Sequence, residues 1–335
     1  MSPYPLILKP ILMPKVWGGE RLARLGKAVK AGERIGESWE VADLEQTSPS
    51  GAGGAAARSM IENGPMAGKT LHDAMSAFGE RGMLGEASGD RSFPLLVKYL
   101  DARENLSVQV HPSIAYAKAH PGAHIKTECW YIVEAEPGSV IYKGVRAGVT
   151  REEFGERLRE GDGSRIIECL ETAAAIPGEM HNLPSGTVHA LGAGVVVAEV
   201  QTPSDTTFRV HDWGRAGREL HVDAAMECIT FGPAREASRG APGETVSRLV
   251  STGFFVVDEI RGEPGARLEV RRSAPGPARA MVLMWLSGAG AVEHDRGDVP
   301  MRAGRTVVVP AAAAEGAWVR FETPSVVLRA VVMSG

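Results

Sequence analysis

The sequence predicts a mainly β protein made of two β-barrel or β-sandwich units and one small helical insert. Short segments that alternate apolar and polar residues recur along most of its 335 residues, and such alternation is typical of half-buried strands. Turns rich in Gly and Pro separate these segments at the spacing found in sandwiches and barrels. One stretch near the middle of the chain, beginning at Thr150, has the capping pattern of a helix instead.

Composition excludes several classes of function. A hydrophobic content of 44% and a mean hydropathy of -0.09 indicate a globular protein, while a net charge of -4 and a pI near 6.2 argue against a nucleic-acid partner. No run approaches the roughly 18 apolar residues of a membrane span, and no signal peptide is recognisable, so no membrane partner is expected. The cysteines are three and widely spaced, which disfavours disulfides and Cys-based zinc sites and predicts a cytoplasmic protein.

The first third of the chain should supply strands, one helix and the start of a buried core. Residues 3–14 alternate apolar side chains with prolines, which predicts an edge strand because proline cannot donate a ladder hydrogen bond. Further elements expected here are a short helix over 20–25, a strand over 36–42, a flexible loop over 48–57, an amphipathic helix over 70–78 and a central strand over 93–102.

The stretch from Leu106 to Glu128 carries the first functional signal. In a strand that includes L-S-V-Q-V-H, Ser107, Gln109 and His111 share one polar face. Gln109 and His111 could bind a divalent metal together with Glu128 from the next strand. The same face could equally belong to a strand that faces water, so a further ligand downstream has to decide between the two interpretations.

The middle of the chain should contain a strand pair and the helical insert. Strands are expected over 130–134 and 140–143, joined by a Pro-Gly turn. Thr150 to Glu153 forms a capping box, which predicts a helix over 151–159 and a second helical turn over 166–170.

The next strands supply further polar side chains on one face. A Pro-Ser-Gly turn precedes a strand that carries His189, and residues 195–201 alternate so that Glu199 lies opposite the apolar set. A returning strand over 208–215 then carries Arg209. His189 is therefore the downstream ligand that favours a metal site over a solvent-facing strand.

The last third of the chain reads as a separate set of strands with no metal site. A connector is expected over 218–245, and the only histidine beyond it is His294, which lies in a charged loop. Strands are expected over 253–260, 267–271, 280–286, 305–309, 318–322 and 325–332.

Four residues form the candidate ligand set: Gln109, His111, Glu128 and His189. Mixed nitrogen and oxygen ligands suit zinc, manganese, iron or cobalt better than calcium. With the cations Lys126 and Arg209 nearby in sequence, this predicts an open, catalytic site. A buried carboxylate such as Glu199 could relay a proton there, or it could be a structural glutamate paired with Lys126 or Arg209.

Five segments give the chain a family resemblance. F-P-L-L-V-K-Y-L-D-A, L-S-V-Q-V-H-P, K-T-E-C-W-Y, L-P-S-G-T-V-H-A and S-D-T-T-F-R-V-H-D-W-G-R occur in this order. They resemble the motifs of type I mannose-6-phosphate isomerases in their compact bacterial form, zinc enzymes of the cupin superfamily. The resemblance implies two cupin-type β-barrels (jelly rolls): an N-terminal catalytic domain over 1–148 with 173–240, a helical insert over 149–172, and a metal-free C-terminal domain over 241–335.

The resemblance also implies an activity and residue roles. The activity is interconversion of mannose 6-phosphate and fructose 6-phosphate through a cis-enediol, with one Zn²⁺ per chain. Position by position, the implied zinc ligands are Gln109, His111, Glu128 and His189, the catalytic residues Arg209, Lys126 and Glu199, and the substrate-binding residues Ser107, Lys126 and Asp205. Asp205 is expected to orient Arg209.

Two other functions remain open from the sequence. One is a cupin that binds a sugar phosphate without turning it over, and the other is a metal-dependent cupin oxygenase, which the Gln and Glu ligands and the cations disfavour. The small-molecule phosphosugar is the expected partner, with the chain a monomer or a small homo-oligomer. His120, His124 and His181 are expected to be surface histidines in loops rather than ligands.

Overall fold

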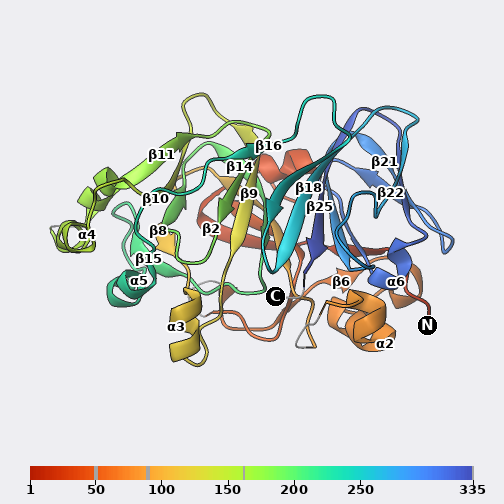
Figure 1. The fold of residues 1–335 in the computed structure, drawn as a ribbon, viewed down its shortest axis with the longest axis horizontal. Coiled ribbons are helices and arrows are strands. Elements are labelled where there is room, and N and C mark those ends of the chain that lie inside the picture. Colours follow the sequence, from red (N-terminus) through yellow and green to blue (C-terminus); the bar gives the residue numbers. More distant parts are fainter. Residues whose placement is uncertain (49–51, 88–90, 161–162, 334–335) are drawn as a thin grey trace.

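The structure is a computed structural model that describes residues 1–48, 52–87, 91–160 and 163–333, and it confirms a mainly β chain. Two β-sandwiches lie side by side (Figure 1); most strands up to residue 239 belong to the first, and the strands from residue 246 onward belong to the second. The expected barrels are not closed, because within the described ranges each sheet ends in edge strands that do not pair with one another. Closure of a barrel requires that pairing.

The first sandwich stacks a seven-stranded sheet on a five-stranded sheet. The N-terminal seven-stranded sheet has the order β16 (Ser238–Arg239), β12 (Glu179–Leu183), β9 (Glu128–Ala135), β14 (Val195–Gln201), β7 (Leu96–Ala102), β2 (Ile11–Gly19) and β3 (Ile35–Val41). The five-stranded sheet has the order β11 (Leu170–Ala174), β10 (Val140–Val145), β13 (His189–Leu191), β8 (Val108–Val110) and β15 (Phe208–His211).

The second sandwich includes strands from both ends of the chain. The C-terminal seven-stranded sheet has the order β17 (Val246–Ser251), β18 (Phe255–Gly262), β25 (Ser325–Val332), β20 (Met281–Ser287), β23 (Thr306–Val309), β1 (Leu6–Lys9) and β6 (Met60–Ile61). The four-stranded sheet has the order β19 (Arg267–Glu269), β24 (Trp318–Phe321), β21 (Ala289–Glu293) and β22 (Val299–Arg302). A two-stranded sheet pairs β4 (Asp43–Leu44) with β5 (Ala57–Arg58).

The strand predicted over 3–14 is two strands that enter different sheets. Pro10 separates them, and a proline there removes the N–H that a continuous ladder would need. β1 pairs with β23 in the C-terminal seven-stranded sheet, while β2 lies between β7 and β3 rather than at an edge. Pro14 is tolerated inside β2 because the register shifts there. The division between the two domains at residue 241 stays a prediction. Two strands from the N-terminal side of that division, β1 and β6, lie in a sheet of the second sandwich.

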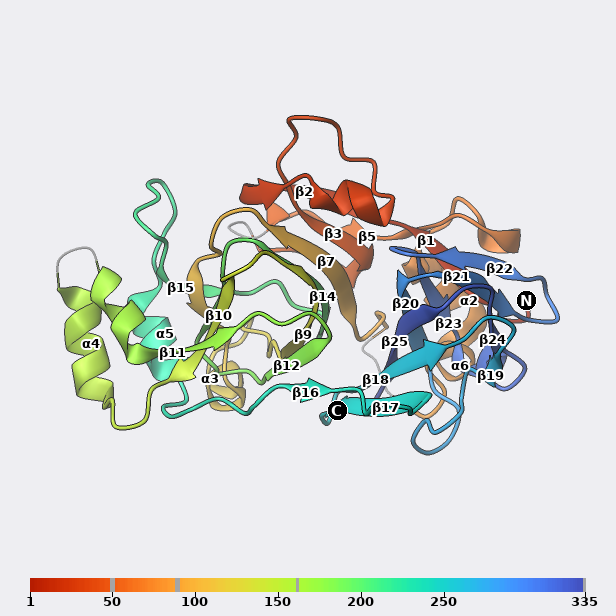
Figure 2. The same ribbon diagram turned by 90° about the horizontal axis from the view of Figure 1, so that it is seen from above.

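The largest apolar cluster lies between the two seven-stranded sheets. β14 contributes Val196, Ala198 and Val200 from one sandwich, and Phe255 and Val282 come from the other. Figure 2, seen from above, shows these two sheets in the middle, with α4 beyond the first sandwich and with β21 and β24, in the outer sheet of the second sandwich, on the opposite side. Separate apolar clusters fill the inside of each sandwich.

Helices cover the ends and the outside of the sheets. They are η1 (Arg21–Leu25), η2 (Gly64–Met66), α2 (Leu71–Leu84), α3 (Ile114–Ala119), α4 (Arg151–Arg159), η3 (Ser164–Cys169), α5 (Val222–Cys228) and α6 (Ala311–Ala314). The Thr150 side chain caps α4 by accepting from the Glu153 amide at 3.1 Å, and the second turn of the insert is a 3₁₀ helix. Residues 49–51 of the loop expected over 48–57 lie outside the described residues. No helix in the described ranges is long and apolar enough to cross a membrane.

Candidate active site

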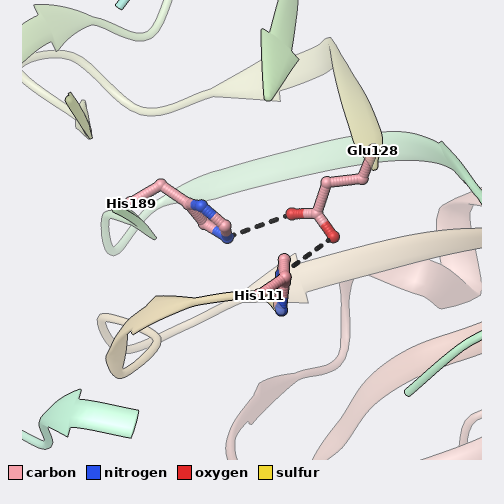
Figure 3. Close-up of side chains that lie close together, drawn as sticks. All are labelled: His111, Glu128 and His189. Atoms are coloured by element: carbon pink, nitrogen blue, oxygen red, sulfur yellow. Dashed lines mark ion pairs between the residues drawn. The ribbon is translucent and has the colours of Figure 1, made fainter. Parts of the chain in front are cut away.

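Three of the four predicted metal ligands meet inside the first sandwich. His111, Glu128 and His189 are all buried, and their donor atoms lie within 4.8 Å of one another. The Glu128 carboxylate lies between the two imidazoles, with Oε2 3.2 Å from His111 Nε2 and Oε1 3.1 Å from His189 Nε2 (Figure 3). The fourth, Gln109, has its side-chain amide 3.4 Å from His189 Nε2. The residues expected to form one ligand set are therefore adjacent.

The backbone fixes which ring nitrogen of each histidine faces the centre. His111 Nδ1 lies 3.1 Å from the Thr206 carbonyl, and His189 Nδ1 lies 2.8 Å from the Thr187 carbonyl. A proton on Nδ1 is then held by a carbonyl, which leaves the Nε2 lone pair free to bind a metal. Burial and the Lys126 charge lower the pKa of His111 to about 3, so this ring is neutral as a ligand must be.

Strand register explains why residues far apart in sequence converge. Arg209 of β15 pairs with Gln109 of β8, and Gln109 pairs with His189 of β13, so the three lie in one row across the five-stranded sheet. The turn before β13 needs Gly186, whose φ is +90° and whose added Cβ would lie 2.8 Å from Thr230 Oγ1. Glu128 begins β9 of the opposite sheet and faces this row.

The donor set fits a transition metal. Glu128 Oε1 is buried and accepts no hydrogen bond from the residues that the structure describes, and a buried carboxylate oxygen without a donor is costly unless a cation is bound. Lys126 Nζ contacts Glu128 Oε2 and lies 2.9 Å from His111 Nε2. Two imidazole nitrogens, a carboxylate and an amide oxygen suit zinc or another divalent transition metal.

A second row of functional side chains crosses the N-terminal seven-stranded sheet. In register, Trp39 of β3 pairs with Lys98 of β7, Lys98 with Glu199 of β14, Glu199 with Trp130 of β9, and Trp130 with His181 of β12. Trp130 Nε1 donates to Glu199 Oε2 at 2.9 Å. Lys98 Nζ lies 3.3 Å from Glu199 Oε1. The sequence alternatives paired Glu199 with Lys126 or Arg209, whereas its ion-pair partner is Lys98.

The electrostatic environment of Glu199 is that of a proton acceptor with a raised pKa. Burial raises the pKa of this carboxyl, Lys98 opposes the rise, and the charges of Glu128 and Glu37 add to it. Burial alone would lower the pKa of Lys98, but Glu199 and Glu37 hold that pKa above its usual value, so the amine is charged. A buried carboxylate beside a fixed cation can move a proton near neutral pH.

The two rows face one cavity rich in cations. Its predicted members are Ser107, Gln109, Lys126, Glu199, Asp205 and Arg209, and the residues that sequence reasoning missed are Lys15, Glu37, Lys98, Thr207 and Arg218. Glu37 binds two of the missed cations, with Lys15 at 3.2 Å and Lys98 at 3.5 Å. Five cations and three carboxylates make the cavity suited to an anionic, hydroxyl-rich ligand.

Two predicted contacts differ in the structure. Within the described residues no hydrogen bond joins Asp205 to Arg209; Asp205 instead accepts from the Ser48 amide at 2.8 Å, while Arg209 donates to the Glu219 carbonyl at 2.7 Å. His181 is not a surface histidine, because it lies in β12 with 1% exposure. The strand of His181 is too short for its alternation to be recognised in the sequence. Lys98, in contrast, is one of only two charged residues in an apolar run, with Asp101 the other.

The fold and the site define a two-sandwich, cupin-like protein with one candidate metal centre. The family model for phosphomannose isomerase type I, catalytic domain, matches residues 6–142. Mannose-6-phosphate isomerase of Streptococcus mutans is 32% identical over 91% of this chain and 92% of its own length. A Bacillus subtilis protein named probable mannose-6-phosphate isomerase GmuF is 39% identical over 68% of this chain and 69% of its own.

A solved structure gives the same result. The crystal structure of mannose 6-phosphate isomerase from Bacillus subtilis has a TM-score of 0.80 and 28% identity, and the match covers 97% of this chain and 99% of that one. The chain belongs to the type I mannose-6-phosphate isomerase family.

Proposed function

We propose that this protein is a metal-dependent aldose-ketose isomerase that interconverts mannose 6-phosphate and fructose 6-phosphate. One observation carries the proposal: the Glu199–Lys98 pair lines a cation-rich cavity together with Gln109 and Lys126, and these two residues contact the His111–Glu128–His189 centre. A module that only bound a sugar phosphate would need the cations but not a buried carboxylate of raised pKa beside a metal centre. Family membership points to the same reaction.

The chain's own residues account for the proton transfer. Glu199 takes the proton from C2 of the aldose and returns it to C1, because Trp130 and Lys98 hold its two oxygens and its pKa is raised toward neutrality. Removal of that proton leaves a cis-enediolate, and the hydroxyl proton of O2 moves to O1, so that the ketose carbonyl forms at C2. Gln109, His111, Glu128 and His189 would hold a metal, which would supply electrophilic stabilisation of the charged oxygen.

The cations of the cavity bind the rest of the substrate. Arg209 and Lys126 lie beside the metal ligands, where they neutralise charge on the reacting oxygens. Arg218, 3.1 Å from Asp212, adds a further cation to the same cavity and suits the phosphate. Ser107 and Asp205 supply hydroxyl and carboxylate groups for sugar hydroxyls.

Zinc is the metal that we propose, one ion per chain. A solved mannose 6-phosphate isomerase of this fold is described as holo and zinc bound, and two imidazoles with a carboxylate and an amide match the ligand preferences of zinc. We also propose a cytoplasmic location, in line with three buried free cysteines, and a monomer or small homo-oligomer.

A coupled assay tests the function directly. Zinc-loaded protein is incubated with mannose 6-phosphate, and fructose 6-phosphate formation is followed with and without a chelator. The expected result is conversion that the chelator abolishes and added zinc restores. Binding of mannose 6-phosphate without conversion would instead establish the non-catalytic cupin, and oxygen uptake by iron-loaded protein would establish the oxygenase.

A further inference from the structure

A second cavity, of about 460 Å³, lies where the two halves of the chain meet. Its walls are β1, the residues that follow η1, Glu40 of β3, and the turn between β22 and β23. We call it the junction cavity. It shares no lining residue with the candidate active site. Its volume is within the range of small-molecule sites, which are often found at domain junctions.

One wall of the junction cavity is formed where the backbone at Gly304 passes close to the backbone at Leu25. Gly304, in the β22–β23 turn, has a φ of +81°, and a Cβ added to it would lie 2.0 Å from the Leu25 carbonyl oxygen. Lys27 fixes the same contact, since its Nζ donates to the Gly304 carbonyl at 2.6 Å and to Glu40 Oε2 at 2.7 Å. The Lys27 and Glu40 side chains are 4% and 2% exposed. This part of the wall is therefore fixed by a buried ion pair, while Lys9 and Arg302 lie at the exposed side of the cavity.

The charges that remain on the lining favour an anion. Lys27 and Glu40 neutralise each other, which leaves Lys9, Arg302 and Arg305 against the single carboxylate of Glu62. Among the residues that the structure describes, neither Lys9 nor Arg302 forms an ion pair. An excess of two positive charges matches the charge of a phosphomonoester at neutral pH, roughly -1.5 to -2.

The remaining lining indicates an organic group attached to that anion. Thr306 Oγ1 is buried and has no hydrogen-bond partner in the described part of the chain, so the lining offers an unused donor and acceptor. Leu8, Leu12 and Leu25 supply apolar wall. From these contacts we propose that the junction cavity binds a small phosphomonoester, with the phosphate at Arg302 and Lys9 and the organic group toward the leucines.

Strand β3 connects this cavity to the candidate active site. Glu37 and Trp39 line the active-site cavity, whereas Glu40 lines the junction cavity and accepts from Ser38 Oγ at 2.6 Å. A ligand that moves Glu40 therefore acts one residue from Trp39, whose ring Lys98 Nζ overlies, and three residues from Glu37, which pairs with Lys98. An effect of the junction ligand on turnover rests on the proposed isomerase function. Binding of a ligand in the junction cavity does not rest on that function.

Phenyl phosphate is a suitable probe because it joins a phosphate to an apolar ring. Isothermal titration of the full-length, zinc-loaded protein should give two binding events. Lys9→Ala/Arg302→Ala removes one event, with at least a tenfold loss of affinity, and Arg209→Ala leaves that event intact. The matched control is Lys30→Ala/Arg296→Ala, which removes one lysine and one arginine outside the junction cavity and keeps both events.

Two outcomes would overturn the inference. One is unchanged stoichiometry and affinity in Lys9→Ala/Arg302→Ala, and the other is loss of all binding in Arg209→Ala. Far-ultraviolet circular dichroism checks folding, and Arg302→Lys should recover part of the affinity. The result is independent of the isomerase assay, because a chain that bound the probe at Lys9 and Arg302 but did not isomerise mannose 6-phosphate would contradict only the proposed function.

Discussion

At the scale of single residues, the candidate active site holds two carboxylates to which we assign different roles, metal binding and proton transfer. Glu128 and Glu199 are both buried carboxylates, yet their surroundings differ. Burial opposes ionisation of Glu128, but Lys126, His111 and His189 hold its pKa well below the usual value, whereas the pKa of Glu199 is raised. The ionised carboxylate suits a metal ligand, and the one of raised pKa suits a base.

This difference predicts two distinct variants. Glu199→Gln should retain zinc and lose turnover by about 100-fold or more, because an amide cannot accept the C2 proton. His189→Ala should lose zinc and activity together, since it removes one of the donors at the centre. Metal content by mass spectrometry and kcat by coupled assay measure the two effects. Near-native turnover in Glu199→Gln would show that another group is the base.

His181 should make stability depend on pH. Burial lowers its pKa from 6.5 to about 4, with a contribution from Lys143, and neither ring nitrogen has a hydrogen-bond partner within the described residues. In the unfolded chain His181 is therefore protonated below about pH 6.5, whereas in the folded chain it is protonated only below about pH 4. The folded protein loses stability as pH falls through this window, by about 2 kcal/mol between pH 7 and pH 4.5.

Urea unfolding of the metal-free protein at pH 7 and pH 4.5 measures this loss. His181→Leu should reduce the fall in the free energy of unfolding by about 2 kcal/mol. The control is His120→Leu, because His120 is exposed on the surface. An equal fall in wild type and His181→Leu would mean that His181 is protonated as readily in the folded chain as in the unfolded one.

At the scale of elements, alternation along a strand predicts a side chain's face but not its neighbours. For β14 the sequence assigns Val196, Ala198 and Val200 to one face and Glu199 to the other, and the structure confirms it. The ion pair between Glu199 and Lys98 depends on the register between β14 and β7, which no local pattern contains. The four candidate metal ligands were predicted from strand alternation and the order of polar residues, and the family resemblance implied the same set, but their adjacency again depends on strand register.

The row of paired side chains across β3, β7, β14 and β9 contains one cation, Lys98, and its position allows the effect of removing it to be predicted. Lys98→Met keeps the buried stem but leaves Glu37 and Glu199 without their shared charge, so the pKa of both carboxyls should rise. If Glu199 is the proposed base, which accepts a proton only when ionised, the acid limb of the pH profile of kcat should move upward by about one unit. Loss of one partner from a buried pair also costs about 3 kcal/mol of stability.

The measurements are kcat from pH 5 to 9 and the midpoint of urea unfolding. Lys98→Arg keeps the positive charge, so the acid limb of its pH profile should lie close to that of the wild type. Lys118→Met provides the control for a lysine away from the cavity. An unshifted acid limb in Lys98→Met would mean that the group observed in the profile is not Glu199.

At the scale of the whole molecule, the two sandwiches share one core. The cluster between the seven-stranded sheets draws side chains from both halves, and β1 completes the sheet of the other half by pairing with β23. Tyr131 of β9 also donates to Glu259 of β18 across this boundary at 2.6 Å. The sequence separated the halves by composition and turn spacing, and it could not reveal β1's partner because that pairing joins residues about 300 positions apart.

A shared core predicts that damage in the C-terminal half reaches the metal centre. Phe255 is fully buried between the sheets, and Phe255→Ala should lower the free energy of unfolding by about 3 to 5 kcal/mol through lost contacts and a cavity. If the halves unfold together, the urea midpoint for zinc release, followed with a colorimetric chelator, should fall along with the midpoint for loss of circular dichroism. The matched control is Phe321→Ala, which opens a cavity inside the second sandwich but leaves the shared cluster intact. Zinc release at an unchanged midpoint in Phe255→Ala would show that the N-terminal sandwich is stable without the core that joins it to the other half.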